Sequence, residues 1–158
     1  MSTQVTEWLS RQGRRFKVIQ HAPTYDAIEE AIVLGEPSGD VIKTVGLDVG
    51  AGHALAVLPA SEKIDLHLMH VATGDSHAHL ASETELRPDF PEYELGAIPP
   101  VGSLLRLPVY VDPHVMMEPE VAFAATRTSS VKMRTEDLFG GEYVTVTPLA
   151  RHYQDQGG

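Results

Sequence analysis

The sequence predicts an α+β fold in which a mixed, mostly antiparallel sheet is flanked by short helices. About seven short runs of strand character alternate along the chain with about four short helical patterns. In the second half, the strand-like runs follow one another at the spacing of hairpins. The 158 residues suffice for one core, and no repeat or linker divides them. We therefore expect a single domain over 1–152 and a flexible tail over 153–158.

The first half of the chain predicts two helices, a strand and a hairpin. One helix is expected over 3–12, where apolar residues recur on one face, and a strand follows over 16–20. Asp26, with a glutamate three residues later, is typical of a helix N-terminus, and Gly35 suits the end of that helix. A glycine-rich connection at 49–53 separates two apolar runs, which is the pattern of a β-hairpin.

The second half predicts further short elements. Asp65 can cap a helix that ends at Gly74, and Ser82 with Glu85 forms a capping box. Thr135 is expected to cap one more helical turn. Strands are expected over 77–80, 107–111, 121–125, 131–134 and 143–147.

Composition narrows the class of protein. The chain has no cysteine, which excludes disulfides, thiol catalysis and cysteine-ligated zinc. The net charge of -10 is unusual for a nucleic-acid-binding protein. The cations nevertheless gather in two groups, which are Arg11, Arg14, Arg15 and Lys17, and Arg127, Lys132 and Arg134. Any contact with RNA is therefore expected to be small and salt-sensitive, although an ordinary solvated surface explains both groups equally well.

Lys43 is the first candidate functional residue. It lies within an otherwise apolar strand expected over 41–48, and lysine is seldom buried without a partner or a function. One interpretation is a cation that faces a pocket and holds a phosphate or carbonyl oxygen. The other is an edge-strand lysine whose amine reaches solvent. The pattern alone leaves both interpretations open.

A loop over 96–102 is the second candidate. In order, its residues are Gly96, Ala97, Ile98, Pro99, Pro100, Val101 and Gly102. Glycine lets the backbone approach a ligand closely, and paired prolines restrict the shape of the loop. The main-chain N–H groups of such a loop can line a pocket, although a purely structural turn has the same composition.

The eight histidines raise the question of a metal site. Four are close in sequence, and pairs of them could share one face of a helix or strand: His67, His70, His77 and His79. The sequence has no His-Glu-x-x-His motif, and it also lacks the Gly-x-Ser-x-Gly elbow of many serine hydrolases. A solvated histidine-rich face is the better interpretation, and we predict no metal site.

Four segments, in this order, resemble the YbaK / prolyl-tRNA synthetase editing-domain family. They are the strand with His21 before the Asp26 helix, the lysine strand Val41-Ile42-Lys43-Thr44-Val45, the loop over 96–102, and the closing strands at 109–112 and 123–133. The glycine–proline loop is the most specific of the four. Together with the lysine strand it makes a fairly specific pair, and the resemblance spans about residues 16–147.

The resemblance implies a twisted, partly barrel-like sheet and a trans-editing hydrolase that deacylates mischarged aminoacyl-tRNA. Small amino acids such as Ala or Cys on tRNA(Pro) are familiar substrates of the family. The implied reaction is substrate-assisted and uses no metal or organic cofactor, because a hydroxyl of the terminal adenosine positions the attacking water. The resemblance places Lys43 in the active site, with Gly96 and Ala97 as backbone donors. It implies substrate contacts by His21, Thr44, Ile98, Pro99, Pro100, Gly102, Ala125 and Arg127.

Two of these positions depart from the pattern that many editing domains share. Ala125 and Arg127 stand where those domains carry glycine–x–histidine. An arginine is found there in the YbaK-like branch, so Arg127 marks that branch. The methyl group of Ala125 is expected to narrow the pocket and to bear on the choice of amino acid.

The expected partner is the acceptor end of an aminoacyl-tRNA, with an aminoacyl-tRNA synthetase as a further candidate. We expect a cytoplasmic protein without membrane association, since no apolar run has the length of a membrane span. One alternative is a non-catalytic module of the same fold that binds tRNA ends or a synthetase. Another is a small-molecule hydrolase or nucleotide-binding protein. A panel of charged tRNAs separates these functions, because only a deacylase turns them over.

Overall fold

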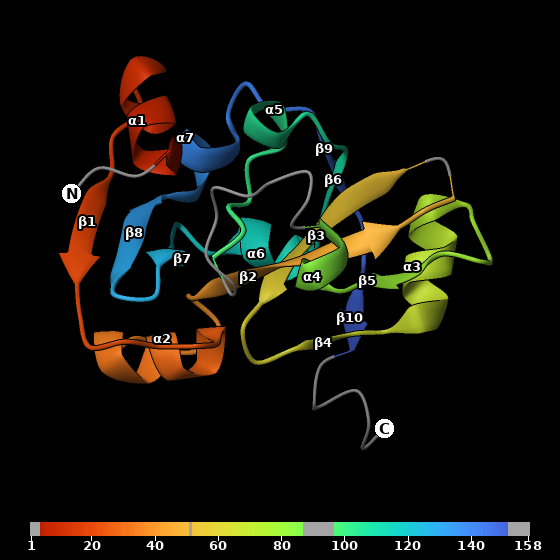
Figure 1. Ribbon diagram of the computed structural model, residues 1–158, viewed down its shortest axis with the longest axis horizontal. Helices are drawn as coiled ribbons and strands as arrows, with labels where there is room; N and C mark the ends of the chain where they lie inside the picture. The colour runs from red at the N-terminus through yellow and green to blue at the C-terminus, as the bar shows by residue number, and fades with distance from the viewer. Residues whose placement is uncertain (1–3, 51, 87–96, 152–158) are drawn as a thin grey trace.

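Two β-sheets form the frame of the structure (Figure 1). The computed structural model describes residues 4–50, 52–86 and 97–151. The smaller sheet is antiparallel, with strand order β1-β8-β7. Its strands are β1 (Lys17–Gln20), β7 (Glu120–Thr126) and β8 (Ser129–Arg134). Because β1 pairs with β8, Gln20 lies opposite Ser129, and the start of the chain is brought beside its last third.

The larger sheet has the order β5-β2-β3-β6-β9 and mixes strand directions. The pairs of β2 with β5 and with β3 are antiparallel, whereas β3, β6 and β9 run parallel. Its strands are β2 (Ile42–Asp48), β3 (His53–Pro59), β5 (His79–Ala81), β6 (Val109–Val111) and β9 (Val144–Val146). A separate antiparallel pair consists of β4 (Lys63–Ile64) and β10 (Ala150–Arg151). The predicted mixed sheet with mostly antiparallel pairing is thus confirmed.

The two sheets meet at one end of the β2–β3 hairpin. The hairpin is the predicted one, with Asp48 opposite His53 across the glycine-rich connection. At the other end, Val41 forms an isolated parallel bridge with Ala122 of β7. The described strands do not close into a barrel, so the partly barrel-like sheet implied by the resemblance is realised as two sheets joined at this bridge.

Seven helices occur in the described residues. They are α1 (Gln4–Arg11), α2 (Ala27–Leu34), α3 (Leu66–Thr73), α4 (Glu83–Leu86), α5 (Gly102–Leu105), α6 (Pro113–Met117) and α7 (Thr135–Phe139). The caps predicted at Asp26, Gly35 and Asp65 are confirmed. The side chains of Asp26 and Asp65 accept hydrogen bonds from Glu29 N and Leu68 N. Gly35 has a φ of 66°, the left-handed conformation that a helix end requires.

Two local predictions are corrected by the structure. Thr135 is the first residue of α7 rather than its cap, and its hydroxyl donates to the carbonyl of Glu118. The sequence pattern gave no helix at 113–117, yet Asp112 caps α6 by accepting from His114 N, and Pro113 begins it. Proline is well placed in the first turn of a helix, where its missing N–H has no intrahelical partner to lose.

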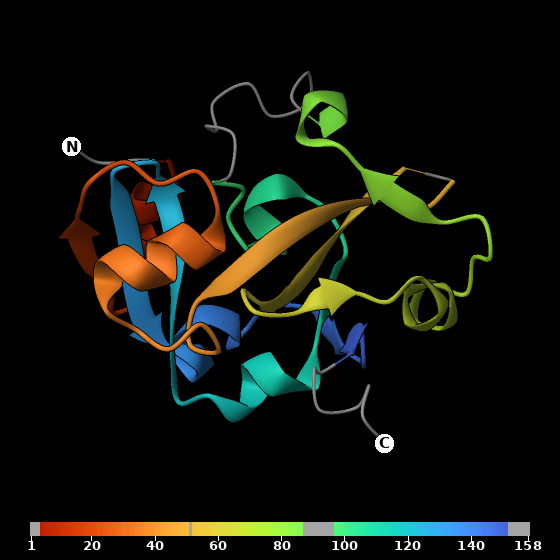
Figure 2. The same ribbon diagram turned by 90° about the horizontal axis from the view of Figure 1, so that it is seen from below.

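The largest cluster of buried apolar side chains joins both sheets to α1 and α7. Leu9 of α1, Leu55 of β3 and Leu138 of α7 are fully buried in it. A smaller cluster lies under α2, where Ala31 packs with Val41 and Ala122. Figure 2 shows α2 lying against the three-stranded sheet, next to the junction of the two sheets. None of the described helices combines the length and the apolarity needed to cross a membrane.

Candidate active site

A pocket of about 190 Å³ opens where the two sheets meet. Its walls come from the start of α2, from β2, from β7 and from the loop before α5. The lining residues are Tyr25, Asp26, Ala27, Glu30, Ile42, Lys43, Thr44, Val45, Ile98, Phe123 and Ala124. Drug-sized ligands ordinarily occupy roughly 300–1,000 Å³. The pocket is therefore suited to a small chemical group rather than to a whole nucleotide.

Lys43 lines this pocket and is half-buried. On the side of β2 that faces β5, pairing covers only Gly46 to Asp48, so no β5 residue lies opposite Lys43. Its Nζ donates to the carbonyl of Ala60 at 3.4 Å. Burial lowers the pKa of Lys43, and the charge of Lys63 lowers it further, while Asp26 and Glu62 act in the opposite direction. Lys43 therefore lines the pocket from a position where β2 is an edge strand.

The described part of the glycine–proline loop forms one wall of the site. Ile98 lines the pocket, and Ala97 lines a small hollow beside it that has no room for a water molecule. Pro99 and Pro100 are buried. Gly96 lies outside the described residues.

Gly102 is required for packing within the chain. A Cβ at this position would lie 2.6 Å from the carbonyl oxygen of Leu107 and 2.6 Å from Cγ2 of Val109. The close approach that this glycine permits is therefore to its own chain, where α5 begins.

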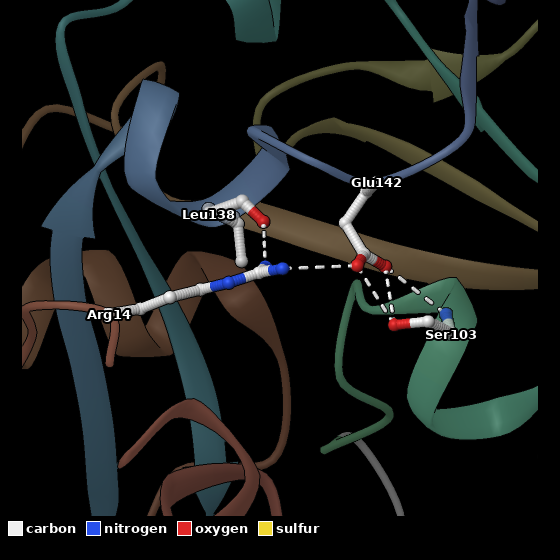
Figure 3. A network of polar contacts seen from close by, with 4 residues as sticks. All are labelled: Arg14, Ser103, Leu138 and Glu142. Atoms are coloured by element: carbon white, nitrogen blue, oxygen red, sulfur yellow. Dashed lines mark hydrogen bonds and ion pairs between the residues drawn. The ribbon is translucent and has the colours of Figure 1, made fainter. Parts of the chain in front are cut away.

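A polar network fastens α5, and with it the end of the loop, to distant parts of the chain (Figure 3). Glu142 accepts from the hydroxyl of Ser103 at 2.8 Å and from its backbone N–H at 3.1 Å. Arg14 reaches the same carboxylate at 3.2 Å and donates to the carbonyl of Leu138 at 2.8 Å. The Arg14 and Glu142 side chains are 13% and 5% exposed, so this ion pair is largely shielded from water.

Three predicted contact residues occupy different positions around the pocket. Thr44 lines the pocket beside Lys43. Arg127 lines the small hollow beside the pocket, with its guanidinium carbon 5.1 Å from the ring centre of the exposed Tyr25. Ala125 is buried in the main core cluster, and its neighbour Ala124 lines the pocket instead. The size of the side chain at 124 therefore bears directly on the pocket, while the predicted contact at 125 stays a prediction.

His21 does not line the pocket but connects to it through two residues that the sequence did not reveal. Its Nε2 lies 2.8 Å from the Ser130 hydroxyl, which lies 2.5 Å from Oε2 of Glu30. Glu30 is 1% exposed and forms part of the pocket wall. Burial raises the pKa of Glu30 to about 7, although the hydrogen bond from Ser130 acts the other way. A sequence signal existed for Glu30, because it shares a helix face with Ala27 and Leu34, three residues before and four after.

Two groups of described residues bring together three side chains of metal-ligand type: Asp48, His79 and Glu85, and Glu62, Asp112 and His114. In the second group, Oδ2 of Asp112 accepts from the N–H groups of Leu149 and Ala150, and Oδ1 accepts from His114 N. Asp112 therefore joins the start of α6 to the segment at 149–150. Of the four histidines close in sequence, His79 alone belongs to either of these groups in the described residues.

Fold and pocket together define a small α+β domain with a lysine-lined pocket at the junction of two sheets. Residues 21–140 match the family model of the aminoacyl-tRNA editing domain, and the chain belongs to this family. The match includes Lys43, the glycine–proline loop and the Glu30–Ser130–His21 contacts. A comparison with functionally curated proteins gave no significant match.

Solved structures share the fold over nearly the whole chain. Hypothetical protein APE2540 is 21% identical with a TM-score of 0.83, over 94% of this chain and 99% of that one. A structure proposed to be a trans-editing enzyme for prolyl tRNA synthetase is 24% identical with a TM-score of 0.82, over 94% of this chain and 96% of that one. A protein from Marinobacter aquaeolei VT8, proposed to act in signal transduction, is 17% identical with a TM-score of 0.72 and is covered over 31% of its length. At these identities the likeness establishes the fold.

Proposed function

We propose that this chain is a trans-editing deacylase, which hydrolyses the ester between a small amino acid and the terminal adenosine of a mischarged tRNA. Alanine or cysteine on tRNA(Pro), or on a related tRNA, is the proposed substrate. The observation that carries the proposal is the half-buried Lys43 in a small pocket, within a chain that belongs to the aminoacyl-tRNA editing family.

The size of the pocket supports a small amino acid. A cavity of about 190 Å³ has room for a short side chain and the ester group, whereas larger side chains meet Phe123, Ala124 and Ile98. Exclusion of large groups by a fixed wall discriminates more sharply than favourable contact does, because one extra methylene in a pocket is worth only about 1–3 kcal/mol. The adenosine then lies outside the pocket, on the surface near Tyr25 and Arg127.

Most of the predicted residues have a role in the proposed reaction. Lys43 orients the ester or the terminal adenosine, and Thr44 lies beside it on β2. Backbone N–H groups near Gly96 and Ala97 stabilise the developing oxyanion, a contribution of about 2.7–4 kcal/mol per donor. A ribose hydroxyl of the substrate positions the attacking water. Pro99, Pro100 and Gly102 hold the loop in shape, and Arg127 contacts the nucleotide.

Single-turnover deacylation of a panel of aminoacyl-tRNAs tests the proposal. The panel includes Ala-tRNA(Pro), Cys-tRNA(Pro) and correctly charged Pro-tRNA(Pro). We expect hydrolysis of one or more mischarged species by the wild-type chain. Lys43→Ala should lower kcat/KM by about 100-fold, and Lys43→Met should do the same, because it keeps the stem of the side chain but removes its charge.

Lys17→Ala, which removes an exposed strand lysine, is the matched control and should retain the wild-type rate. Unchanged activity of both Lys43 variants would refute the role of Lys43. Binding of charged tRNA without turnover by the wild type would instead identify a non-catalytic module that binds tRNA ends.

A further inference from the structure

A chain of hydrogen-bonding groups runs from the pocket wall to the outer surface. It begins at Glu30 on α2, passes through Ser130 on β8, which is fully buried, and ends at the partly exposed His21 after β1. The two links measure 2.5 Å, from Glu30 Oε2 to Ser130 Oγ, and 2.8 Å, from Ser130 Oγ to His21 Nε2. At the surface end, Nδ1 of His21 lies 2.7 Å from the carbonyl oxygen of Ala22.

The hydrogen bonds between Glu30, Ser130 and His21 determine how many protons these three groups share. A carbonyl oxygen only accepts, so Nδ1 of His21 carries a proton that it donates to Ala22. The Ser130 hydroxyl has one proton, which can fill only one of its two links. The other link needs one more proton, on either Glu30 or Nε2 of His21. In one arrangement Glu30 donates to Ser130 and Ser130 donates to His21, and in the other both hydrogen bonds run in the opposite direction. Two protons shift between the arrangements, and the net result is the transfer of one proton between Glu30 and His21.

We propose that Glu30 is the general acid of this pocket and that Ser130 and His21 are positioning residues that relay protons to it from solvent. This inference rests on the proposed deacylase function. It assigns the group that protonates the departing ribose oxygen, a role that the proposed function leaves open.

In the proposed step, water adds to the ester carbonyl carbon and releases a proton to solvent. The bond from that carbon to the ribose oxygen breaks, and its electron pair stays on the oxygen. The carboxyl group of Glu30 donates its proton to this oxygen and becomes a carboxylate, to which Ser130 then donates. His21, whose Nδ1 already carries a proton, takes up a proton from solvent at Nε2. Nε2 then donates to Ser130, and the hydroxyl proton of Ser130 passes to Glu30, which restores the neutral imidazole and the carboxyl group. The products are the free amino acid and the ribose hydroxyl.

The surroundings of Glu30 suit an acid that works near neutral pH. Burial raises the pKa of Glu30 to about 7, which is close to the optimum for proton transfer at physiological pH. The other titratable groups around the pocket are Lys43 on β2 and Tyr25 and Asp26 before α2. The lining residues from β7 and the loop, Phe123, Ala124 and Ile98, carry no charge.

The first test follows the δ-carbon of Glu30 by NMR in ¹³C-glutamate-labelled protein and needs no turnover. The signal is assigned by its loss in Glu30→Gln. We expect a titration midpoint near 7 in the wild type. Ser130→Ala should raise the midpoint, because the hydrogen bond that favours the carboxylate is lost, and Ser130→Thr should restore it. A midpoint near 4.5, the ordinary value, would overturn the proposal.

The second test is the pH profile of single-turnover deacylation. The rate should fall above the midpoint measured by NMR and should follow that midpoint upward in Ser130→Ala, which a merely structural serine would not cause. Glu30→Gln should lower kcat by about 10²–10⁴-fold with little change in KM, and it should abolish this pH dependence. His21→Gln, which alters the partly exposed end, should lower kcat less. Glu29→Gln, on the next position of α2, is the control and should leave rate and profile unchanged.

The outcomes separate this inference from the proposed function. If Lys43→Ala abolishes activity while Glu30→Gln keeps the wild-type rate and pH profile, the relay is wrong and the deacylase stands. If Glu30→Gln fails to fold, His21→Gln and Ser130→Ala still test the relay. A wild-type pH profile of deacylation in both variants would overturn it. If the wild type hydrolyses no aminoacyl-tRNA, the deacylase and the acid role of Glu30 both fall.

Discussion

At the scale of single residues, the burial of Glu30 makes the stability of the fold depend on pH. Its pKa lies at 4.5 when exposed and at about 7 in the folded chain. The folded state therefore keeps a proton that the unfolded state releases between these two values. The stabilisation is fully present below about pH 4.5 and is lost as the pH rises through about 7. The difference between the two pKa values corresponds to about 3 kcal/mol at most.

Replacing Glu30 by glutamine should remove this dependence. Between about pH 5 and pH 8, the wild type should lose free energy of unfolding relative to Glu30→Gln, by up to about 3 kcal/mol. Urea unfolding at the two pH values measures the difference, and Glu29→Gln should behave like the wild type. Parallel pH curves for the wild type and Glu30→Gln would contradict the prediction.

Lys43 could be predicted as a site residue from the sequence, whereas the role of Glu30 could not. Lys43 was found because a charge interrupts an apolar strand, which is a local pattern. Glu30 had a local signal too, but its meaning depends on Ser130, which lies 100 positions further along the chain. Pairing of β1 with β8 brings His21 to the same place. No periodicity within one element predicts such a meeting.

At the scale of elements, the helix caps were predictable because a cap is decided within a few residues. Asp26 and Asp65 begin their helices as expected, and Gly35 and Gly74 end them in the left-handed conformation. The two-residue strands β4 and β10 were not predicted, since two residues carry no alternation and the partners are distant in sequence. Asp112 and Pro113 form a local signal, but it is shared by turns and helix starts.

The position of α5 should depend on the network of Arg14, Ser103 and Glu142 (Figure 3). Glu142→Ala leaves the Arg14 guanidinium buried without its carboxylate and frees Ser103 from its acceptor. Breaking such a shielded pair costs about 3 kcal/mol, so the midpoint of urea unfolding should fall. KM for aminoacyl-tRNA should also rise, because the loop over 97–102 leads directly into α5.

Glu136→Ala is the matched control, because its pair with Arg134 is 70% and 65% exposed. Ion pairs of this kind contribute little. Equal unfolding midpoints for the two variants would show that the buried network does not hold α5.

At the scale of the whole molecule, the acidic charge limits the proposed contact with RNA to a few cations near the pocket. Three of the seven cations in the two basic groups form described ion pairs with carboxylates of the same chain: Arg14 with Glu142, Lys132 with Glu36 and Glu120, and Arg134 with Glu136. Hydrogen bonding to Glu36 raises the pKa of Lys132. Arg14 and Lys132, whose pairs are largely shielded, are therefore poorly placed to hold phosphates, whereas Lys43, Lys63 and Arg127 lie at or near the pocket.

The proposed binding of tRNA should therefore involve contacts with few phosphates. With two or three cations in contact, the plot of log affinity against log salt should have a slope of roughly -2, at about -0.7 per contact for single strands. Fluorescence anisotropy with an acceptor-stem minihelix that carries a non-hydrolysable aminoacyl group measures this slope. Lys63→Ala should make the slope shallower by about 0.7, while Lys132→Ala should leave it unchanged because Glu36 and Glu120 already neutralise that lysine. Full-length tRNA should bind little better than the minihelix. A slope steeper than about -5, or a large gain from the rest of the tRNA, would mean that a broad surface of this acidic chain contacts the nucleic acid.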